Sequence, residues 1–495
     1  MSLFYDLLAV FSAVFVVLFS YFQWTYNYWE RKKVPFLKPS IPFGNTGNPL
    51  NNNTTRRQDL VVEWYRQFKA AGHKYGGVYV LHRPVLIATH PDLIRNIFNK
   101  DFRYFTDRGL FYDEKTSPLS ANLFNLDGLE WKHMRAKLSP TFTSGKMKMM
   151  YETMLACSEP LVESIGGEVG SAVDIKEFLG RFTTDVIGRC AFGIDCNSFK
   201  NPNSEFRKQG KAIFAIPNFM YIIKAIIRSN FPNIARILRL QILNPGQQKF
   251  FIDMVTDTIN HRKRNNLELN DFMQLLIKLM EGEEGLSFSQ VAAQVFVFFL
   301  AGFETSSSTM TFALYELAKN KDLQQKARMD VTKVLEQHDG KLTYDSLGEM
   351  KYLHQIVDET LRKWPAGETL FRVCSESYKL PNTDVVIDKG VKVWISVKAL
   401  HWDPEWFPEP ERFDPERFSA KNKENIKPFT YLPFGEGPRN CLGLRFGLMQ
   451  VRLGLAVLLK NYKFDVSSKT KEPIELERSM LPVVKGGIWL NVERI

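Results

Sequence analysis

The chain has 495 residues, 44% of them hydrophobic, which is enough for a large core. Its 65 basic and 54 acidic side chains give a net charge of +11, but no basic run is longer than three residues, which argues against nucleic-acid binding. Five cysteines at irregular spacing argue against a disulfide framework and favour a reducing compartment.

The chain begins with an apolar segment over residues 3–22. As a helix, this segment would span about 30 Å, the thickness of a bilayer core. Aromatic residues follow it like an interfacial belt, and the basic residues 31–33 then place the rest of the chain in the cytosol by the positive-inside rule. We predict a membrane anchor over residues 1–30 rather than a cleavable signal peptide, with a buried helix of the globular part as the alternative. The belt consists of Trp24, Tyr26, Tyr28 and Trp29.

The next segment contains three prolines, Pro35, Pro39 and Pro42, which exclude a helix. We expect a stiff connector over residues 31–45, between the anchor and a catalytic domain over residues 46–495.

Helical patterns dominate this domain. Residues 75–90 alternate like a short hairpin, and residues 91–102 have the periodicity of a helix that starts at a proline. Strand signals return over residues 366–400 and at the C-terminus. The pattern predicts one mainly α unit with small peripheral β-sheets. Because no G-x-G-x-x-G lies between a strand and a helix, we expect the chain not to bind a nicotinamide cofactor itself.

A long helix is predicted over residues 287–319, capped by Ser287 or Ser289. Gly302, in its middle, would allow a close approach to the backbone. Glu304 and Thr305 place an acid and a hydroxyl beside that point, which suits a proton relay next to a bound ligand. The alternative is an ordinary buried helix, in which the threonine donates to the carbonyl four residues back.

Two further pairs share helix faces. Glu359 and Arg362 are three residues apart, which is typical of a solvated surface bridge. Trp131 and Arg135 are one turn apart and could together hold an anionic group, or they could be a core tryptophan and a surface arginine. The eight histidines show no paired metal-ligand spacing, so we expect no non-haem metal site.

The stretch FGEGPRNCLG, residues 434–443, surrounds a single cysteine with glycine and proline. This density forces an unusual backbone path. A zinc site would need a second cysteine two to four residues away, and no other cysteine is that near. The pattern indicates that the Cys441 sulfur faces a ligand.

Taken together, these motifs resemble the cytochrome P450 family of haem-thiolate mono-oxygenases, and the chain looks most like its insect microsomal, xenobiotic-metabolising members. FGEGPRNCLG matches the family's haem-binding loop, and AGFET (301–305) its oxygen-activating helix. ETLR (359–362) and PERF (415–418) match its Glu–x–x–Arg pair and partner arginine motif. WKHMR (131–135) matches its haem-contacting helix.

The resemblance implies roles for these residues. Cys441 would be the proximal thiolate ligand of the iron of haem b, and Glu304 and Thr305 would help to deliver protons to O2 on the distal side. Glu359, Arg362 and Arg417 would form a structural network. The remaining haem contacts would come from Phe434, Gly443, Ala301 and Gly302, with Arg439, Arg135, Trp131, Arg372 and Arg108 around the two propionates.

The resemblance also implies a substrate pocket. Glu368 departs from the family pattern, because an apolar side chain is usual there; it would face a cationic substrate or turn into solvent. The apolar run 213–241 would be a membrane-dipping access lip or a buried helix pair. The other pocket residues would be Phe111, Leu123, Phe124, Phe298, Ala301, Leu370 and Leu481.

The expected activity is insertion of one atom of O2 into lipophilic substrates. Electrons from NADPH would arrive through a FAD- and FMN-containing reductase, with cytochrome b5 as a second candidate partner. The expected location is the endoplasmic reticulum membrane, with one span and a cytosolic catalytic domain. Xenobiotics such as plant toxins or insecticides are the favoured substrates, and one endogenous hormone or fatty acid is the alternative. The remote alternatives are a hydroperoxide isomerase and a non-enzymatic haem-binding protein.

Overall fold

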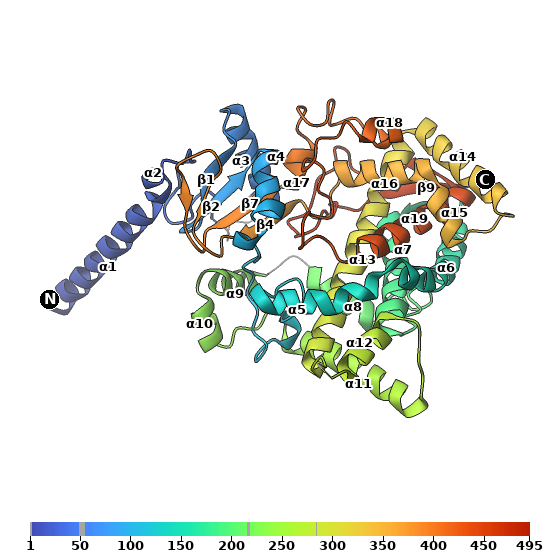
Figure 1. Ribbon diagram of the computed structural model, residues 1–495, viewed down its shortest axis with the longest axis horizontal. Coiled ribbons are helices and arrows are strands. Elements are labelled where there is room, and N and C mark those ends of the chain that lie inside the picture. The colour runs from blue at the N-terminus through green and yellow to red at the C-terminus, as the bar shows by residue number, and fades with distance from the viewer. Residues whose placement is uncertain (1, 49–54, 215–217, 284) are drawn as a thin grey trace.

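The computed structural model describes residues 2–48, 55–214, 218–283 and 285–495. An N-terminal helix projects from a body in which helices prevail and a small sheet lies at the side nearest that helix (Figure 1). This arrangement confirms the prediction of a mainly α unit with peripheral sheets and a single apolar N-terminal helix. The long central helix α13 (Phe288–Lys319) lies in the middle of the body and is mostly buried.

Helix α13 begins where the sequence predicts. The Ser287 hydroxyl accepts from the Gln290 amide at 3.2 Å, and the Gln290 side chain accepts from the Ser287 amide at 3.0 Å. This reciprocal capping box satisfies two amides that a helix start leaves unpaired. The helix then packs against α7 (Ile175–Ile187), α16 (Lys351–Lys363) and α19 (Leu444–Asn461).

The largest sheet has the strand order β1-β2-β7-β4. The predicted hairpin is present as the antiparallel pair β1 (Tyr75–Val80) and β2 (Arg83–Ala88). Strand β2 pairs in parallel with β7 (Lys392–Ser396), which pairs antiparallel with β4 (Thr369–Val373). Strand β4 carries Leu370 and Arg372 toward the cysteine loop. The other two sheets are β3-β9-β8 and β5-β6.

The remaining elements complete the fold. The other helices are α1 (Ser2–Tyr26), α2 (Tyr28–Arg31), α3 (Arg57–Ala70), α4 (Pro91–Arg95), α5 (Gly128–Leu138), α6 (Ser144–Gly166), α8 (Glu205–Phe214), α9 (Phe219–Asn230), α10 (Pro232–Ile237), α11 (Pro245–Asn265), α12 (Phe272–Glu281), α14 (Lys321–Gln337), α15 (Tyr344–Glu349), α17 (Val397–His401) and α18 (Ala420–Lys423). The other strands are β3 (Ala172–Asp174), β5 (Tyr378–Lys379), β6 (Val386–Ile387), β8 (Tyr462–Val466) and β9 (Trp489–Arg494).

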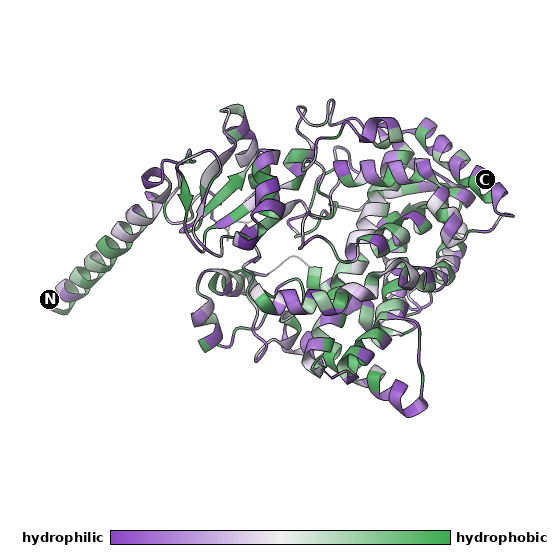
Figure 2. Ribbon diagram, in the orientation of Figure 1, coloured by the Kyte–Doolittle hydropathy of each residue, from purple (hydrophilic) through white to green (hydrophobic). Residues whose placement is uncertain are grey.

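The N-terminal helix is apolar and stands free of the body. The stretch Leu3–Arg31 is long and apolar enough to cross a membrane, and its apolar window has no buried residue. Figure 2 shows hydrophobic colouring along this projecting helix. Helix α13 also passes the test of length and composition, but 56% of its apolar window is buried inside the protein. The first helix is therefore compatible with the predicted membrane anchor.

The predicted aromatic belt divides into two parts. Trp24 is 67% exposed, as an interfacial residue would be, but Tyr26 and Trp29 are buried. The Trp29 indole donates to the Val78 carbonyl at 3.0 Å, and its ring lies so close to Gly77 that a side chain there would collide with it. Tyr26 and Trp29 therefore belong to the catalytic body and not to an interfacial belt, a contact across the chain that local sequence does not reveal.

The predicted connector also lies on the body instead of spanning a gap. Phe36 forms a β-bridge with Gly77, and the Gly77 amide donates to the Pro35 carbonyl at 2.7 Å. Val34, just before them, is buried.

Two truncations test where the anchor ends. Removing residues 2–24 should release a domain that melts like the full chain, because it keeps the docked Tyr26 and Trp29. Removing residues 2–33 should lower the melting temperature by several degrees, because loss of a buried tryptophan costs about 3–5 kcal/mol. Thermal unfolding of both haem-loaded proteins in detergent checks this, with Trp29→Ala in the full chain as control. Equal melting of the two truncations would contradict the boundary.

Candidate active site

The cysteine loop lies just before α19 and has a strained path. Gly435 and Gly437 have φ angles of +69° and +73°, in the left-handed region that glycine tolerates. A side chain on Gly437 would also collide with the Phe98 carbonyl. The Cys441 amide donates to the Phe434 carbonyl at 2.9 Å, which closes the loop. These contacts hold the Cys441 side chain in one direction, and its surface is exposed.

The other four cysteines are buried, so only Cys441 presents its sulfur to open space. Burial of the site by surrounding atoms nevertheless raises the pKa of the Cys441 thiol above its ordinary value. The Gly443 amide and the guanidinium groups of Arg135 and Arg108 act in the opposite direction. A bound metal ion would supply the further positive charge that keeps such a thiol ionised.

Arginines gather around this loop from distant parts of the chain. Burial and the nearby Arg439 lower the pKa of Arg372 to about 9. Burial also lowers the pKa of Arg439 to about 10, although Asp107 and Asp127 each lie 3.8 Å from its Nη2. Within the part of the chain that the structure describes, Arg372 Nε and Arg439 Nε and Nη1 are buried without a hydrogen-bond partner. Buried donors of this kind call for an anionic ligand.

The remaining predicted contacts join the same cluster. Arg135 donates to the Asn440 carbonyl at 2.9 Å and to its side chain at 2.8 Å. Arg108 donates to the Arg439 carbonyl at 3.0 Å. The Arg439 guanidinium lies 4.2 Å from the centre of the Trp131 ring. The structure thus brings together all five residues that the sequence predicts around the propionates. Their unpaired donors beside an accessible sulfur fit a ligand that carries both a metal and carboxylates.

The middle of α13 is accessible at one position. Ala301 is exposed, its neighbours Leu300 and Gly302 are half-buried, and most of the helix beyond them is buried. Thr305, one turn later, donates its hydroxyl to the Ala301 carbonyl at 2.6 Å. This is the bond that the ordinary-helix alternative predicts, and it also places the hydroxyl on the Ala301 side of the helix.

Gly302 and Glu304 face α7 instead. A side chain on Gly302 would collide with Ile187, so the close approach that this glycine permits is between two helices. Glu304 is buried and forms an ion pair with Lys176 at 2.8 Å. Lys176 also donates to the Ser307 and Ser308 hydroxyls, both at 2.8 Å. Gly302 thus packs against Ile187 of α7, its expected contact with the cofactor stays a prediction, and the Glu304 carboxylate is paired with a lysine.

The Glu359–Arg362 pair is fully buried, so the expectation of a solvated bridge is wrong for it. Arg362 Nε and Nη2 bind the two Glu359 oxygens at 2.7 and 2.8 Å. Arg362 also donates to the His401 and Pro410 carbonyls, both within 2.9 Å. Arg417 Nε lies 3.6 Å from Glu359. The three residues of the expected network therefore meet.

His401 links this network to the cysteine loop. Its Nε2 accepts from the Leu432 amide at 2.9 Å, two residues before Phe434, and its Nδ1 donates to the Arg362 carbonyl at 3.1 Å. Burial and the neighbouring Arg362 lower the pKa of His401 to about 3, so the ring is neutral and can make both bonds. A lone buried histidine gave no such signal in the sequence.

The loop before α5 stands over the arginine cluster. Phe124 is 43% exposed, packs edge-on against Phe371 at 6.4 Å between ring centres, and lies 4.1 Å from the Arg108 guanidinium. The Leu123 amide donates to the Gln294 side chain of α13 at 2.8 Å. Gln294 was missed; a glutamine inside the apolar run of α13 is the signal that could have found it.

The other predicted pocket residues have varied surroundings. Leu370 lies next to Gly435 of the cysteine loop. Phe111 lies under Arg236 of α10 at 5.6 Å, and Leu481 is buried in the segment before β9. Phe298 packs against Phe142 and Phe272 with ring centres 5.6 and 5.3 Å apart, in a cluster with Phe446 of α19. Phe298 thus packs among aromatic side chains, and its expected place in the pocket lining stays a prediction.

Glu368 neither faces a substrate nor turns into solvent. It is 4% exposed and pairs with Arg56, which precedes α3, and with Lys398 of α17 at 3.3 Å. Both expectations for Glu368 are therefore wrong, because it is buried and two cations, one just before α3 and one on α17, neutralise it. Glu368, which departs from the family pattern, therefore belongs to an ionic cluster with Arg56 and Lys398.

The run 213–241 lies partly outside the described residues, at 215–217. Its described part forms α9 and α10, where Phe219, Met220, Ile234 and Ile237 are between 48% and 80% exposed. The alternative of a buried helix pair is therefore wrong for these helices.

Comparison with known proteins agrees with this geometry. A family profile described as Cytochrome P450 matches residues 42–491. The chain belongs to the cytochrome P450 family. It is 43% identical over 493 residues to "Probable cytochrome P450 6a13" of Drosophila melanogaster, with 98% of both chains covered. It is 40% identical to "Cytochrome P450 6A1" of Musca domestica, over 96% of this chain and 95% of the relative. The predicted resemblance to insect members is confirmed.

Membership of the cytochrome P450 family makes the chain a mono-oxygenase and implies a haem-thiolate centre, O2, a redox partner and a small-molecule substrate. The accessible Cys441 sulfur and the unpaired arginine donors fit this cofactor. The roles of single residues at that centre stay predictions.

Proposed function

We propose that the chain is a microsomal mono-oxygenase that oxidises lipophilic foreign compounds, with electrons from NADPH delivered by a reductase. The observation that carries the proposal is the meeting of one exposed cysteine sulfur with buried arginine donors that have no acceptor in the described chain. Haem b has the complementary groups, an iron and two carboxylates. When bound, it would activate O2 for transfer of one oxygen atom to the substrate.

The residues that would hold the haem follow from the contacts. Cys441 would bind the iron, and Arg372 and Arg439 would donate to the carboxylates through their unpaired nitrogens. Trp131 and Arg135 would support them, since the Trp131 ring lies against Arg439 and Arg135 is tied to Asn440. Phe434 and Gly443 flank the sulfur along the loop, and Ala301 offers a small, open surface on the opposite helix.

Proton delivery would rest on Thr305 and Glu304. Thr305 would hold a proton at Oγ1 on the open side of α13. Glu304 would act from behind the helix, and to exchange a proton it would first have to leave the Lys176 ammonium group. Burial lowers the pKa of Lys176 while Glu304 raises it, which shows how closely the two charges depend on each other.

Replacement of Thr305 tests this role. In Thr305→Ala we expect NADPH consumption to continue while product per NADPH falls roughly tenfold or more and hydrogen peroxide rises, in line with loss of a positioned proton donor. Thr309→Ala is the matched control, because Thr309 makes the same kind of bond one turn later, at 2.9 Å to the Thr305 carbonyl. Product and peroxide are measured together. Equal coupling in the two variants would contradict the relay.

The substrate class follows from the lining and from the resemblance. Phe124 and Phe371 present aromatic surface above the arginine cluster, which favours flat or greasy molecules through burial and stacking. Because Glu368 is neutralised by two cations, no preference for amines is expected from it. Broad oxidation of plant toxins and insecticides is the favoured role, and a single hormone or fatty acid is the second candidate.

The proposed location is the endoplasmic reticulum membrane, with one span and the catalytic domain in the cytosol. The apolar α1 and the exposed apolar side chains of α9 and α10 support it. His82, at the turn between β1 and β2, contacts both the Tyr21 ring of α1 and the Phe231 ring before α10, at 6.0 and 5.6 Å between centres. The anchor and the two short helices therefore lie on the same side of the molecule.

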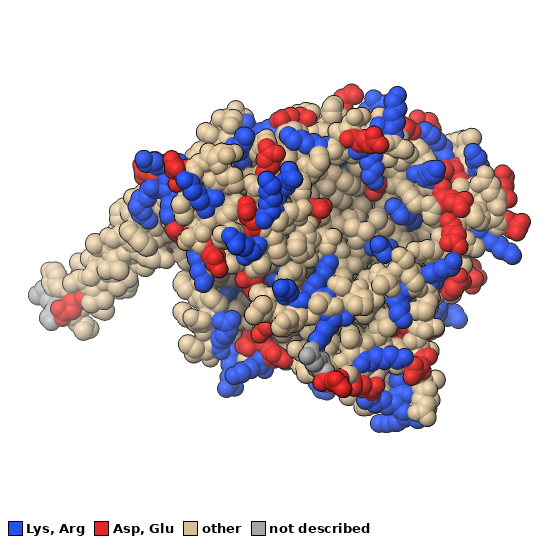
Figure 3. Space-filling model, in the orientation of Figure 1, with Lys and Arg blue, Asp and Glu red and all other residues tan. Residues whose placement is uncertain are grey.

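A membrane-bound NADPH–cytochrome reductase is the proposed partner, with cytochrome b5 as a second. Such reductases are acidic, so the net charge of +11 would favour their approach. Figure 3 shows basic and acidic side chains interspersed over the body, and almost none along the projecting helix. This scattered pattern suits a protein partner and a membrane better than nucleic acid.

Turnover of a mixed panel tests the function. The haem-loaded full chain, the reductase and NADPH are incubated with flat aromatics, alkaloid-like amines, fatty acids and steroids. We expect NADPH-dependent gain of oxygen in several of these classes, read by mass spectrometry. Conversion of hydroperoxides without NADPH would instead favour the isomerase. With haem intact, oxidation of a single class would favour an endogenous substrate, and no turnover at all would favour a haem-binding protein.

A further inference from the structure

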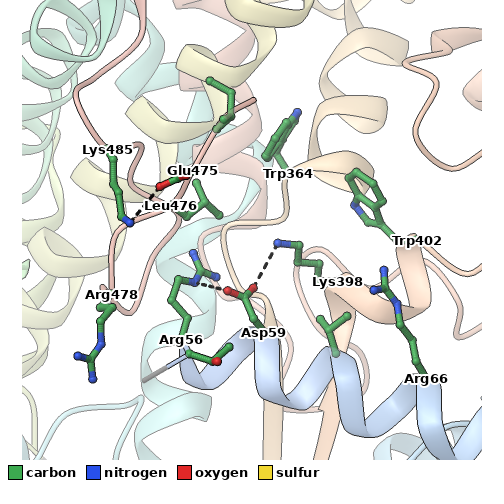
Figure 4. Close-up of a pocket in the computed structure, with 13 residues that line it drawn as sticks. Arg56, Asp59, Arg66, Trp364, Lys398, Trp402, Glu475, Leu476, Arg478 and Lys485 are labelled. Atoms are coloured by element: carbon green, nitrogen blue, oxygen red, sulfur yellow. Dashed lines mark hydrogen bonds and ion pairs between the residues drawn. The ribbon is translucent and has the colours of Figure 1, made fainter. Parts of the chain in front are cut away.

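A cavity of about 710 Å³ lies apart from the cysteine loop. Its walls come from the start of α3, the end of α16, α17 and the segment 474–485 (Figure 4). None of the residues predicted to hold the haem lines it. The cavity is as large as a small-molecule binding site. It has no role in the proposed mono-oxygenase activity.

The cavity is rich in cations. Five basic residues line it, against two acidic ones, Asp59 and Glu475. The buried Glu368 behind Arg56 and Lys398 adds a third carboxylate, which still leaves an excess of two positive charges. The segment 49–54, which lies outside the described residues, contains no charged side chain and so does not alter this balance. The five basic residues are Arg56, Arg66, Lys398, Arg478 and Lys485.

Arg56 is the most informative of them. It is only 6% exposed and lies at the start of α3, with Glu368 on Nη2 and Asp59 3.2 Å from Nε. Its Nη1, however, has no hydrogen-bond partner within the described residues. A buried guanidinium nitrogen without a hydrogen-bond acceptor lowers the stability of the fold, unless a ligand supplies that acceptor. In Figure 4 the Arg56 side chain points from the helix start into the cavity.

The helix itself adds to this donor surface. The start of α3 has no side-chain cap, so its first amides lack side-chain acceptors there and the positive end of the helix dipole is near Arg56. The side chain of Leu476, next to Arg56, and the rings of Trp364 and Trp402 across the cavity form the less polar part of the wall. A ligand that suits both parts has an anionic head and an aromatic or alkyl body.

We propose that this cavity is a second ligand site, which binds a small organic anion such as an aromatic or aliphatic carboxylate, sulfonate or phosphate. The anion pairs with the free edge of Arg56, and the apolar body lies against Leu476 and extends toward Trp364 and Trp402. The site is next to the segment that carries Leu481, because the Gln58 side chain of α3 donates to the Met480 carbonyl at 3.1 Å. An occupant therefore holds α3 and this segment together.

Binding of 2-naphthalenesulfonate to the haem-loaded full chain tests the site. The iron is first saturated with an azole ligand, so that the probe cannot report on the catalytic pocket. We expect saturable binding by calorimetry, and much weaker binding of the neutral analogue methyl 2-naphthyl sulfone. In Arg56→Gln the dissociation constant should rise about tenfold, as for loss of a charge-assisted hydrogen bond.

Arg56→Lys is the second variant if Arg56→Gln does not fold, because it keeps a positive charge beside Glu368 and Asp59 but removes the Nη1 edge. Arg264→Gln, on the exposed end of α11, is the matched control and should bind within about twofold of the unmodified chain. Displacement of the probe by phosphatidylserine vesicles but not by phosphatidylcholine vesicles would identify the natural anion as a lipid head group. If neither kind of vesicle displaces the probe, the natural anion is a soluble molecule. Binding of the probe only when the azole is absent, equal binding of the neutral analogue, or an unchanged constant in the folded Arg56 variants would overturn the proposal.

Discussion

In Cys441→Ala we expect complete loss of the thiolate-type absorption band of the reduced carbon monoxide complex. The reason is the isolation of this sulfur. The four other cysteines are buried elsewhere, so none can replace it. A histidine or water in its place would not push electron density toward iron as a thiolate does. Haem that remains bound should show the spectrum of a neutral ligand, and mono-oxygenase turnover should fall to background.

Because the loop is held by backbone contacts, Cys441→Ala tests whether the sulfur is the iron ligand and does not disturb folding. The closing bond from the Cys441 amide to the Phe434 carbonyl uses backbone atoms only, so alanine preserves it. The positive-φ glycines on either side of the turn are also unchanged. Far-ultraviolet circular dichroism of the variant should match that of the unmodified chain.

Cys374→Ala is the matched control. Cys374 is buried and its thiol donates to the Glu376 carbonyl, so its loss should leave the thiolate band unchanged. Survival of the band in Cys441→Ala, or its loss in Cys374→Ala, would contradict the assignment.

Local sequence predicted backbone elements well where caps and periodicity mark them. Ser287 and Gln290 form the box that begins α13, and the hairpin β1–β2 follows the alternation of residues 75–90. The loop around Cys441 was predictable because glycine and proline at fixed positions restrict the backbone whatever surrounds them.

Side-chain directions were predicted less well, because they depend on which neighbour arrives from far along the chain. Gly302 packs against Ile187, and Glu368 forms an ion pair with Arg56. Trp29 was expected in the membrane belt, but its ring lies against Gly77 in the body of the protein. In each case the partner is far away in sequence, so neither composition nor periodicity carries the information.

Arg362→Met should strongly destabilise the fold and reduce the recovery of haem-loaded protein. Arg362 is fully buried and makes two bonds to Glu359 and two within 2.9 Å to the carbonyls of His401 and Pro410. Methionine fills similar volume but satisfies none of these acceptors. Removing one partner of a buried pair costs about 3–5 kcal/mol, a large part of the roughly 5–15 kcal/mol by which proteins are stable.

The effect should reach the cysteine loop, although Arg362 touches no residue of it. Its bond to the His401 carbonyl helps to hold the ring that accepts from the Leu432 amide, just before Phe434. Arg412→Met is the matched control, since Arg412 pairs with Glu409 at the same three-residue spacing, but both side chains are more than half exposed. That pair should be worth less than about 1 kcal/mol. Denaturant unfolding and haem content are measured for both variants. Equal stability of the two would mean that the buried network does not lock the fold, whereas a deficit confined to Arg362→Met would show that burial, and not the Glu–x–x–Arg spacing as such, gives the motif its effect.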